Sequence, residues 1–461
     1  MSLVVSISGI RGTIGGKPSE GLTPIDTVQF ASAYASWLIS DSAKEQPAVV
    51  LGRDARISGP LVEQLVSATL TAMGVHVYAL GLATTPTVEI AVTELGADGG
   101  IVLTASHNPV EWNALKLLNS RGEFLSASDG DAILHKVRTN DYRYADVRKL
   151  GRIKPLEGLN VKHINQVLKM DLVDVEAIQK KRFRVAIDCV NSVGGIILPE
   201  LLKALGAEEV VELYTEATGE FPHNPEPLPE HLGEISKTMV KDRADVGFVV
   251  DPDVDRLAIV CEDGSMFGEE YTLVAVADYV LSRTPGSTAS NLSSTRALRD
   301  VTERHGQRYF PSAVGEVNVV HAMKENDCVI GGEGNGGIIY PELHYGRDAL
   351  VGIALFLSHL AQSGLSCREL RKKYPDYHIS KNKITLSGDV DLDEILKAFE
   401  QEYPPEEVNT VDGVKVDKPE GWVHLRKSNT EPIIRLYAEA RSREQADQLA
   451  KEAMDTVRKL M

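Results

Sequence analysis

The sequence predicts an α/β fold with three similar mixed α/β/α sandwich domains and a C-terminal α+β domain. Three observations support this prediction. The chain has 461 residues, enough for about three or four domains of ~100–200 residues each. Through most of its length, short apolar runs alternate with helix-like stretches, as in parallel or mixed α/β layers. The final segment breaks this rhythm. We place the domains at residues 1–155, 156–262, 263–375 and 376–461.

The predicted elements follow in chain order. In the first domain we expect alternating strands and helices at residues 48–51, 59–73, 76–80, 87–95 and 100–103, then a charged connector at 141–154. In the second we expect strands at residues 185–188, 210–214 and 244–250, with a helix that ends at residue 205. In the third we expect a helix at residues 271–282, strands near residues 289 and 329, and a long helix after residue 347. In the fourth we expect a strand at residues 378–386, a helix at 392–403, two facing runs at 413–417 and 422–425, and a terminal helix from residue 443.

Charge and cysteine content restrict the partners. A net charge of −17 argues against nucleic acid or an anionic membrane as the main partner. It allows an anionic small ligand, because basic side chains, backbone NH groups or a cation can reverse the field inside one cleft. We find no signal peptide and no apolar stretch of ~18 residues. The four cysteines are scattered without a CxxC pair, which favours free thiols in a reducing compartment. We therefore expect a cytoplasmic protein.

Ser106 lies in the most informative motif, Thr-Ala-Ser-His-Asn-Pro at residues 104–109. The motif follows an apolar run, and open α/β sheets bind ligands at the carboxyl ends of their strands. A serine hydroxyl must be activated to act as a nucleophile. His107 is adjacent and Lys116 follows after a short loop; lysine becomes a usable base when burial or nearby charge lowers its pKa. The alternative is a turn in which serine, histidine and asparagine cap a helix.

Three carboxylates, Asp251, Asp253 and Asp255, follow the predicted strand at residues 244–250. In an extended segment, alternate side chains point to one side, so we expect the three to converge. They would repel one another unless a cation lies between them, and oxygen ligands without histidine or cysteine favour Mg²⁺. The alternatives are a solvated acidic turn or an incomplete Ca²⁺ loop.

Two further loops offer groups that suit a sugar phosphate. Residues 331–337 are glycine-rich, and Glu333 and Asn335 within them could bind sugar hydroxyls. The alternative is a glycine-rich hairpin without a ligand. The second loop offers two guanidinium groups, two hydroxyls and backbone NH groups, which together could bind a phosphate and form a phosphate cradle. The alternative is an ordinary basic turn. The candidate residues of the cradle are Arg426, Ser428, Asn429, Thr430 and Arg435.

Arginines near the N-terminus fit the same chemistry. Arg11 lies in a glycine-flanked loop, and we assign it to phosphate. Arg53 and Arg56 follow a predicted strand. We assign both a structural role, through pairing with Asp54.

Taken together and in this order, these segments resemble the α-D-phosphohexomutase family, with one signature loop in each of four domains arranged around a central cleft. The resemblance covers essentially the whole chain. It implies that Ser106 is a phosphoserine whose phosphate completes the Mg²⁺ shell of Asp251, Asp253 and Asp255. It implies that Lys116 is the general acid/base, that His107 and Arg11 lie close to the phosphoserine, and that Arg256 holds the site together.

The resemblance also implies the substrate contacts and the reaction. Glu333 and Asn335 would recognise the sugar, and the Arg426–Arg435 cradle would hold the phosphate that is not transferred. Hexose 1-phosphate and hexose 6-phosphate would interconvert through a bound hexose 1,6-bisphosphate, in a monomer or a homodimer. The sequence departs from the family pattern at Trp112, Ala114 and Gly337. The last of these removes a possible sugar contact and leaves the substrate open.

The substrate that we favour is glucosamine phosphate, with mannose and glucose phosphates as alternatives. Two other classes of function are a serine-dependent sugar phosphatase and a catalytically silent sugar-phosphate sensor. The cradle at Arg426 argues against the first, because a hydrolase has less need of a second phosphate site. Intact Ser106 and Lys116 argue against the second.

Overall fold

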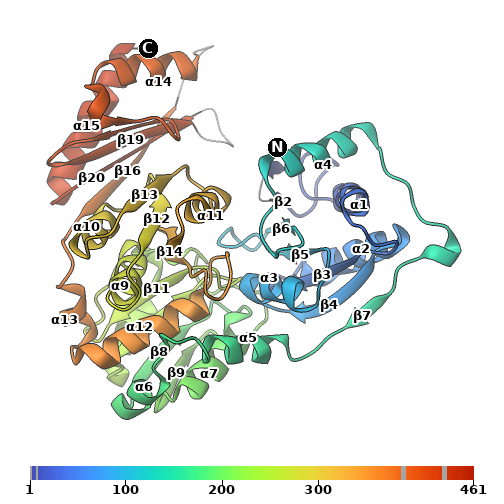
Figure 1. Ribbon diagram of the computed structural model, residues 1–461, viewed down its shortest axis with the longest axis horizontal. Helices are drawn as coiled ribbons and strands as arrows, with labels where there is room; N and C mark the ends of the chain where they lie inside the picture. The colour runs from blue at the N-terminus through green and yellow to red at the C-terminus, as the bar shows by residue number, and fades with distance from the viewer. Residues whose placement is uncertain (1–2, 7–8, 386–390, 428–432, 461) are drawn as a thin grey trace. The chain divides into compact units, whose positions relative to one another are not determined.

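The computed structural model describes residues 3–6, 9–385, 391–427 and 433–460, which form two compact units (Figure 1). The first unit comprises Met1–Thr272 with Gly336–Arg371, and the second comprises Leu273–Asn335 with Lys372–Met461. The boundary falls inside helix α9 (Glu269–Leu281). Among the helices described, none has both the length and the apolar character that a membrane crossing requires.

The first unit begins with a seven-stranded sheet in the order β1-β2-β6-β5-β3-β4-β7. The pairs β5–β3, β3–β4 and β4–β7 are parallel. Strand β6 pairs with β5 on one side and β2 on the other, and both pairs are antiparallel. The strands are β1 (Val4–Ser6), β2 (Gly9–Thr13), β3 (Ala48–Arg53), β4 (His76–Leu82), β5 (Gly99–Leu103), β6 (Trp112–Leu118) and β7 (Ile153–Pro155). The helices are α1 (Pro24–Asp41), α2 (Gly59–Ala72), α3 (Thr85–Glu94) and α4 (Ala127–Thr139), with a 3-10 turn at Val147–Lys149.

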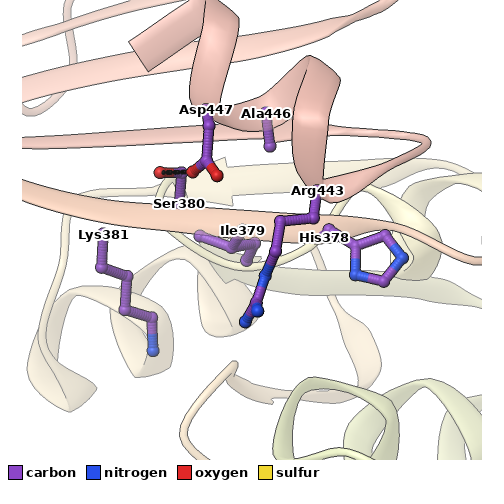
Figure 2. Close-up of a pocket in the computed structure, with 7 residues that line it drawn as sticks. All are labelled: His378, Ile379, Ser380, Lys381, Arg443, Ala446 and Asp447. Carbon is purple, nitrogen blue, oxygen red and sulfur yellow. Dashed lines mark hydrogen bonds between the residues drawn. The ribbon is translucent and has the colours of Figure 1, made fainter. Parts of the chain in front are cut away.

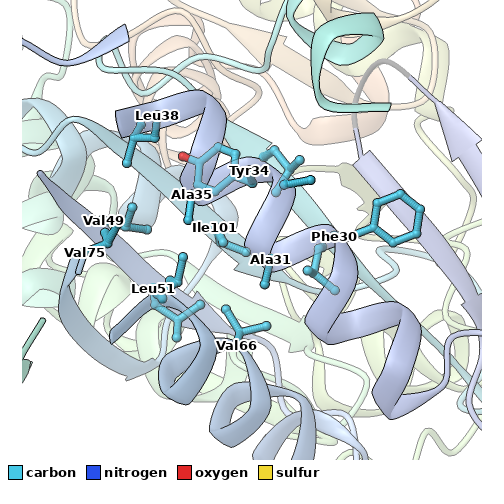
Figure 3. Packing of buried hydrophobic residues seen from close by; sticks show 14 of the residues in the cluster. Phe30, Ala31, Tyr34, Ala35, Leu38, Val49, Leu51, Val66, Val75 and Ile101 are labelled. Atoms are coloured by element: carbon cyan, nitrogen blue, oxygen red, sulfur yellow. The ribbon is translucent and has the colours of Figure 1, made fainter. Parts of the chain in front are cut away.

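Helix α1 supplies much of the core of this sheet (Figure 3). Thr23 and Asp26 form a capping box at its start, and Pro24 occupies the first turn, where no amide donor is needed. Residues 30–35 are all buried, so the middle of the helix is enclosed, and its apolar side chains share one cluster with those of the sheet. One of these side chains is Tyr34, whose hydroxyl donates to the Leu118 carbonyl at 2.7 Å. The polar end of this buried ring is therefore satisfied.

The second sheet of this unit has the order β11-β10-β8-β9. Strands β8, β9 and β10 are parallel and β11 is antiparallel to β10. Every residue of β10 is buried, and all are valine or phenylalanine apart from one glycine. This is expected for a strand covered on both faces. The strands of this sheet are β8 (Arg184–Asp188), β9 (Glu209–Leu213), β10 (Val246–Val250) and β11 (Leu257–Cys261). The unit also contains strand β15 (Gly337–Ile339), which is not part of this sheet. The helices are α5 (Leu159–Val167), α6 (Val175–Lys181), α7 (Gly194–Leu205), α8 (Gly233–Asp242), α12 (Ala349–Ser363) and α13 (Cys367–Arg371), with a 3-10 turn at Pro229–His231.

The second unit contains a parallel layer and an antiparallel layer. Its parallel strands lie in the order β13-β12-β14. Its C-terminal sheet has the order β16-β20-β19-β18-β17, and all of its pairs are antiparallel. Helices α14 and α15 contribute apolar residues to one core with this sheet. The strands are β12 (Ser287–Asn291), β13 (Tyr309–Ser312), β14 (Cys328–Glu333), β16 (His378–Thr385), β17 (Val408–Asn409), β18 (Val414–Asp417), β19 (Gly421–Lys427) and β20 (Ile433–Ala440). The helices are α10 (Ala297–Arg304), α11 (Glu316–Glu325), α14 (Leu392–Gln401) and α15 (Arg443–Leu460), with a 3-10 turn at Pro405–Glu407.

The predicted fold class is confirmed, with one local correction. The predicted facing runs of the last domain are the neighbouring antiparallel strands β18 and β19. The charged connector at residues 141–154 ends in β7, which pairs with β4. The sequence analysis did not identify β6 or β20, although β20 is the central partner of β16 and β19. The domain boundaries remain a prediction.

Candidate active site

Ser106 lies in the loop after β5, and its hydroxyl faces the acidic loop after β10. Its Oγ donates to Asp251 Oδ2 at 2.6 Å. His107 Nδ1 lies 3.4 Å from Ser106 Oγ. The backbone of Ser106 has φ = 49°, a left-handed conformation that is uncommon for residues other than glycine and costs free energy. The surrounding contacts must therefore hold the loop in this conformation.

Asp251, Asp253 and Asp255 come together in a turn, which corrects the expectation of an extended segment. Val254 has φ = 63°, and its amide donates to the Asp251 carbonyl at 3.1 Å. A β-branched residue rarely adopts this conformation, so its presence here indicates a loop fixed by its neighbours. One such neighbour is Ala349, whose amide donates to the Val254 carbonyl at 3.2 Å. The turn leaves one oxygen from each aspartate within 4.8 Å of the others.

These three carboxylates fit a divalent cation. All three side chains are fully buried. Asp253 Oδ1 and Asp255 Oδ1 have no hydrogen-bond partner within the described part of the chain, although buried oxygens are normally satisfied. Burial, followed by the charges of Asp255 and Asp253, raises the pKa of Asp251 well above its usual value. A hard cation would both ligate the two oxygens and offset this repulsion, and an all-carboxylate set suits Mg²⁺.

Lys116 is placed on β6 and reaches the same carboxylates. Its Nζ donates to Asp253 Oδ2 at 2.6 Å and to Asp255 Oδ2 at 3.1 Å. Burial lowers the pKa of Lys116, but the charges of Asp253 and Asp255 together outweigh it and raise that pKa above its usual value. The pKa of Lys116 is therefore raised, whereas we expected it to be lowered, as a base requires. The expectation was wrong because the sequence does not show that the Lys116 amine contacts two carboxylates.

Three further predicted residues surround this cluster. Burial and then the positive charge of Arg256 lower the pKa of His107 well below its usual value, so the ring is neutral near pH 7. Arg256 Nε lies 4.0 Å from both Asp251 and Asp255. Arg11 pairs with Ala114 across β2 and β6, so its side chain lies on the same face of the sheet as Lys116. The structure thus brings seven predicted residues into one site and places Arg11 beside it.

The sequence analysis missed two residues of this site. Arg347, just before α12, donates from Nη2 to Asp255 Oδ2 at 2.7 Å. Thr85, at the first turn of α3, donates from Oγ1 to Asp253 Oδ2 at 2.6 Å and from its amide to the Asp253 carbonyl at 2.9 Å. A charged residue beside the N-cap Asp348 of an otherwise apolar helix was the available signal for Arg347. Thr85 gave no signal, because a threonine at a helix start usually serves the helix itself.

Glu333 and Asn335 lie in the second unit, at and after the end of β14. The Glu333 side chain is buried, and its Oε1 accepts from Asn291 Nδ2 at 2.8 Å and from the Gly315 amide at 3.2 Å. Asn335 Nδ2 lies 3.4 Å from Glu333 Oε2. A carboxylate and an amide therefore lie side by side, with the acceptor and donor groups that bind neighbouring sugar hydroxyls.

Arg426 and Arg435 lie directly opposite each other on β19 and β20. Like charges in this position repel unless an anion or an acidic side chain intervenes. Arg426 Nε is buried and has no hydrogen-bond partner in the ranges that the structure describes. The pair can therefore bind a phosphate, to which arginine donates two parallel hydrogen bonds. The predicted cradle residues Ser428, Asn429 and Thr430 lie outside the described residues.

A pocket of about 310 Å³ in the C-terminal layer is lined by none of the predicted site residues (Figure 2). It lies between β16 and the start of α15, and Ser380 donates to Asp447 at 2.6 Å within it. Its basic residues, His378, Lys381 and Arg443, are all exposed. We therefore do not assign this pocket to the predicted catalytic or substrate-binding loops.

Comparison with known proteins matches four successive segments of the chain to family models. The chain matches the family models described as phosphoglucomutase/phosphomannomutase alpha/beta/alpha domain I at residues 4–144, domain II at 161–264, domain III at 268–377 and C-terminal domain at 382–456. These matches cover most of its length.

Individual relatives cover nearly the whole chain. A "Phosphoglucomutase/phosphomannomutase" of Thermococcus kodakarensis is 35% identical over 94% of this chain and 95% of its own. A "Probable phosphoglucosamine mutase" of Methanopyrus kandleri is 32% identical over 98% and 97%. A crystal structure of a phosphoglucomutase/phosphomannomutase family protein from Burkholderia thailandensis superposes with a TM-score of 0.82 at 26% identity, covering 99% of this chain and 98% of that one. The chain therefore belongs to the α-D-phosphohexomutase family and is a phosphohexomutase, an intramolecular phosphotransferase.

Proposed function

We propose that this phosphohexomutase interconverts hexose 1-phosphate and hexose 6-phosphate by carrying the phosphoryl group on Ser106. The observation that carries the proposal is the 2.6 Å contact between Ser106 Oγ and Asp251 Oδ2, inside a set of three buried carboxylates. A phosphoryl group on a hydroxyl beside these carboxylates would meet its counter-charge in the cation that they hold.

The residues divide the chemistry as follows. Ser106 gives its phosphoryl group to the free hydroxyl of the sugar, and the other phosphate of the resulting hexose 1,6-bisphosphate returns to Ser106. Lys116 is the general acid/base for the reacting hydroxyl, and a cation bound by Asp253 and Asp255 would offset the two charges that raise the pKa of Lys116. Arg256 and Arg11 supply positive charge beside the site. Mg²⁺ bound by Asp251, Asp253 and Asp255 would polarise the transferring phosphoryl group.

We propose glucosamine phosphate as the preferred substrate, with glucose and mannose phosphates as the second candidate. The name of the Methanopyrus relative supports the first and that of the Thermococcus relative the second. The buried carboxylate of Glu333 suits either an ammonium or a hydroxyl at a sugar carbon, and a charged partner would give the stronger hydrogen bond.

The substrate proposal is tested by assaying the purified protein with Mg²⁺ and glucosamine, N-acetylglucosamine, glucose and mannose 1-phosphates in parallel. We expect the highest kcat/KM with glucosamine 1-phosphate. A higher value with glucose or mannose 1-phosphate would transfer the assignment to the second candidate. Release of inorganic phosphate as the main product from every sugar would contradict mutase activity.

Replacing Arg426 by alanine is expected to raise KM by about 10- to 100-fold and to change kcat much less. Loss of a charge-assisted hydrogen bond costs about 1.5–3 kcal/mol, and each 1.4 kcal/mol corresponds to a tenfold change. Steady-state kinetics measures both constants. Arg458→Ala is the matched control, because Arg458 is an exposed arginine of the same unit that pairs with Asp455. An unchanged KM in Arg426→Ala would remove this residue from the phosphate site.

We also propose that the protein acts in the cytoplasm. This is supported by its four cysteines, all of which are buried free thiols. Whether it acts as a monomer or a homodimer remains a prediction.

A further inference from the structure

Arg56 is a fully buried arginine whose guanidinium serves the Ser106 loop rather than a ligand. It donates to four backbone carbonyls of that loop at hydrogen-bond distances of 2.6–2.9 Å. These carbonyls belong to Ser106, Asn108, Pro109 and Trp112. A single planar group with five N–H donors can satisfy four carbonyls at once, which a lysine ammonium with three donors cannot.

Asp54 fixes the other side of the same loop. Its Oδ2 accepts from Arg56 Nε at 3.0 Å and from Thr104 Oγ1 at 2.6 Å. Thr104 Oγ1 in turn accepts from the Ser106 amide at 2.9 Å. Ser106 is therefore held through its amide by Asp54 and Thr104 and through its carbonyl by Arg56, which accounts for its left-handed backbone.

Ala55, between these two residues, is linked to the acidic loop through Ser192. The Ala55 amide donates to Ser192 Oγ at 3.3 Å, and Ser192 Oγ donates to the Pro252 carbonyl at 2.6 Å. Pro252 lies between the predicted cation ligands Asp251 and Asp253. Gly219 also packs against Ala55. A Cβ at Gly219 would lie 2.0 Å from the Ala55 carbonyl oxygen, so only glycine allows this close approach. One short segment thus binds the Ser106 loop directly and the acidic loop through Ser192.

The direction of these contacts matters for a phosphoryl group. Each carbonyl that binds Arg56 points its negative end at the guanidinium, and so not at the Ser106 hydroxyl. If the carbonyls were released, some could turn toward a phosphate dianion and repel it. The charge of Arg56 is compensated by Asp54, so the arginine is suited to orient the loop rather than to bind phosphate.

We propose that Asp54, Ala55 and Arg56 form a positioning bracket that sets the Ser106 hydroxyl against the acidic loop, and that Arg56 thereby directs phosphoryl transfer to the sugar rather than to water. This inference rests on the proposed role of Ser106. It goes beyond the structural role that the sequence suggested, because a pair that only stabilises the fold would affect the amount of folded protein and not the fate of the phosphoryl group.

The test compares Arg56→Lys with Arg53→Lys in the full-length protein. Arg53 is the matched control, because it lies three residues earlier and pairs with Glu63, and its hydrogen bond to the bracket goes to the Asp54 backbone carbonyl rather than to the Asp54 carboxylate or the Ser106 loop. Each protein is phosphorylated with labelled glucose 1,6-bisphosphate, and the label on Ser106 is located by mass spectrometry. We then measure kcat, KM, and the fraction of label that passes to water rather than to sugar phosphate.

We expect Arg56→Lys to lower kcat by about 100-fold, the effect of a misplacement of about 1 Å, with a smaller change in KM. The fraction of label lost to water should rise at least severalfold, while Arg53→Lys behaves as the parent. Arg56→Ala should regain part of its kcat when guanidinium ion is added at millimolar concentration.

Two outcomes would overturn the bracket. One is a lower melting temperature in Arg56→Lys with unchanged kcat and unchanged partition in the folded protein. The other is a normal melting temperature with normal kinetics. Failure of the proposed function is distinguishable from both, since the parent protein itself would then take up no label on Ser106.

Discussion

Ser106→Ala is expected to lower mutase turnover by at least about 10⁴-fold, because loss of a covalent nucleophile removes the path of the reaction. The substitution removes one oxygen and its contact with Asp251 Oδ2. The change in stability should be small by comparison. The measurement is conversion of hexose 1-phosphate to hexose 6-phosphate, together with uptake of label from the bisphosphate, which should vanish.

Ser67→Ala is the matched control for this prediction. Ser67 lies in α2 of the same unit and is 7% exposed, as is Ser106, so the two substitutions remove the same atom from equally buried positions. The control should retain turnover. Residual turnover above about a hundredth of the parent rate in Ser106→Ala would contradict the assignment of this residue as the phosphate carrier.

Asp253→Asn has the second largest expected effect. The amide keeps the shape of the side chain but removes a charge from the cation site, and it places a weaker partner against Lys116 Nζ. We expect the Mg²⁺ concentration needed for half-maximal activity to rise by at least about 10–100-fold, the cost of losing even a supporting partner of a metal ligand. Turnover at saturating Mg²⁺ should also fall.

A direct readout of the metal separates this prediction from activity. Mn²⁺ can replace Mg²⁺ at oxygen sites, and its binding is followed by electron paramagnetic resonance. Asp253→Asn should bind Mn²⁺ at least tenfold more weakly than the parent. Asp263→Asn is the control, because Asp263 lies in an exposed turn of the same unit and pairs with Arg368. Equal Mn²⁺ affinity in the parent and Asp253→Asn would exclude this carboxylate from the site.

The sequence alone predicted the fold class, the family and the position of the chemical groups. Apolar runs such as residues 246–250 and 100–103 are strands, and the loops after them carry Asp251 and Ser106. This success has a physical reason. Strand and helix periodicity is local in the chain, and open α/β sheets carry their ligand-binding loops at the carboxyl ends of their strands, so each loop could be placed within its own sheet.

The sequence did not show which side chains meet. Lys116 was assigned as a base with a lowered pKa, but the structure pairs it with two carboxylates that raise the pKa instead. Arg53 and Arg56 were both assigned to Asp54, yet only Arg56 pairs with its carboxylate, while Arg53 pairs with Glu63. These outcomes depend on segments far apart in the sequence, which local patterns do not describe.

Periodicity and loop chemistry in the sequence therefore determined that Ser106 and the three aspartates each follow the end of a strand, and the resemblance of the motifs to a known family determined that the chain is a phosphohexomutase. Only the tertiary structure decided that Arg347 and Thr85 complete the acidic site and that Arg56 binds four carbonyls of the Ser106 loop. The reason is that a buried charge takes whichever partners the packing of distant segments provides, and the packing is set by all of the cores together.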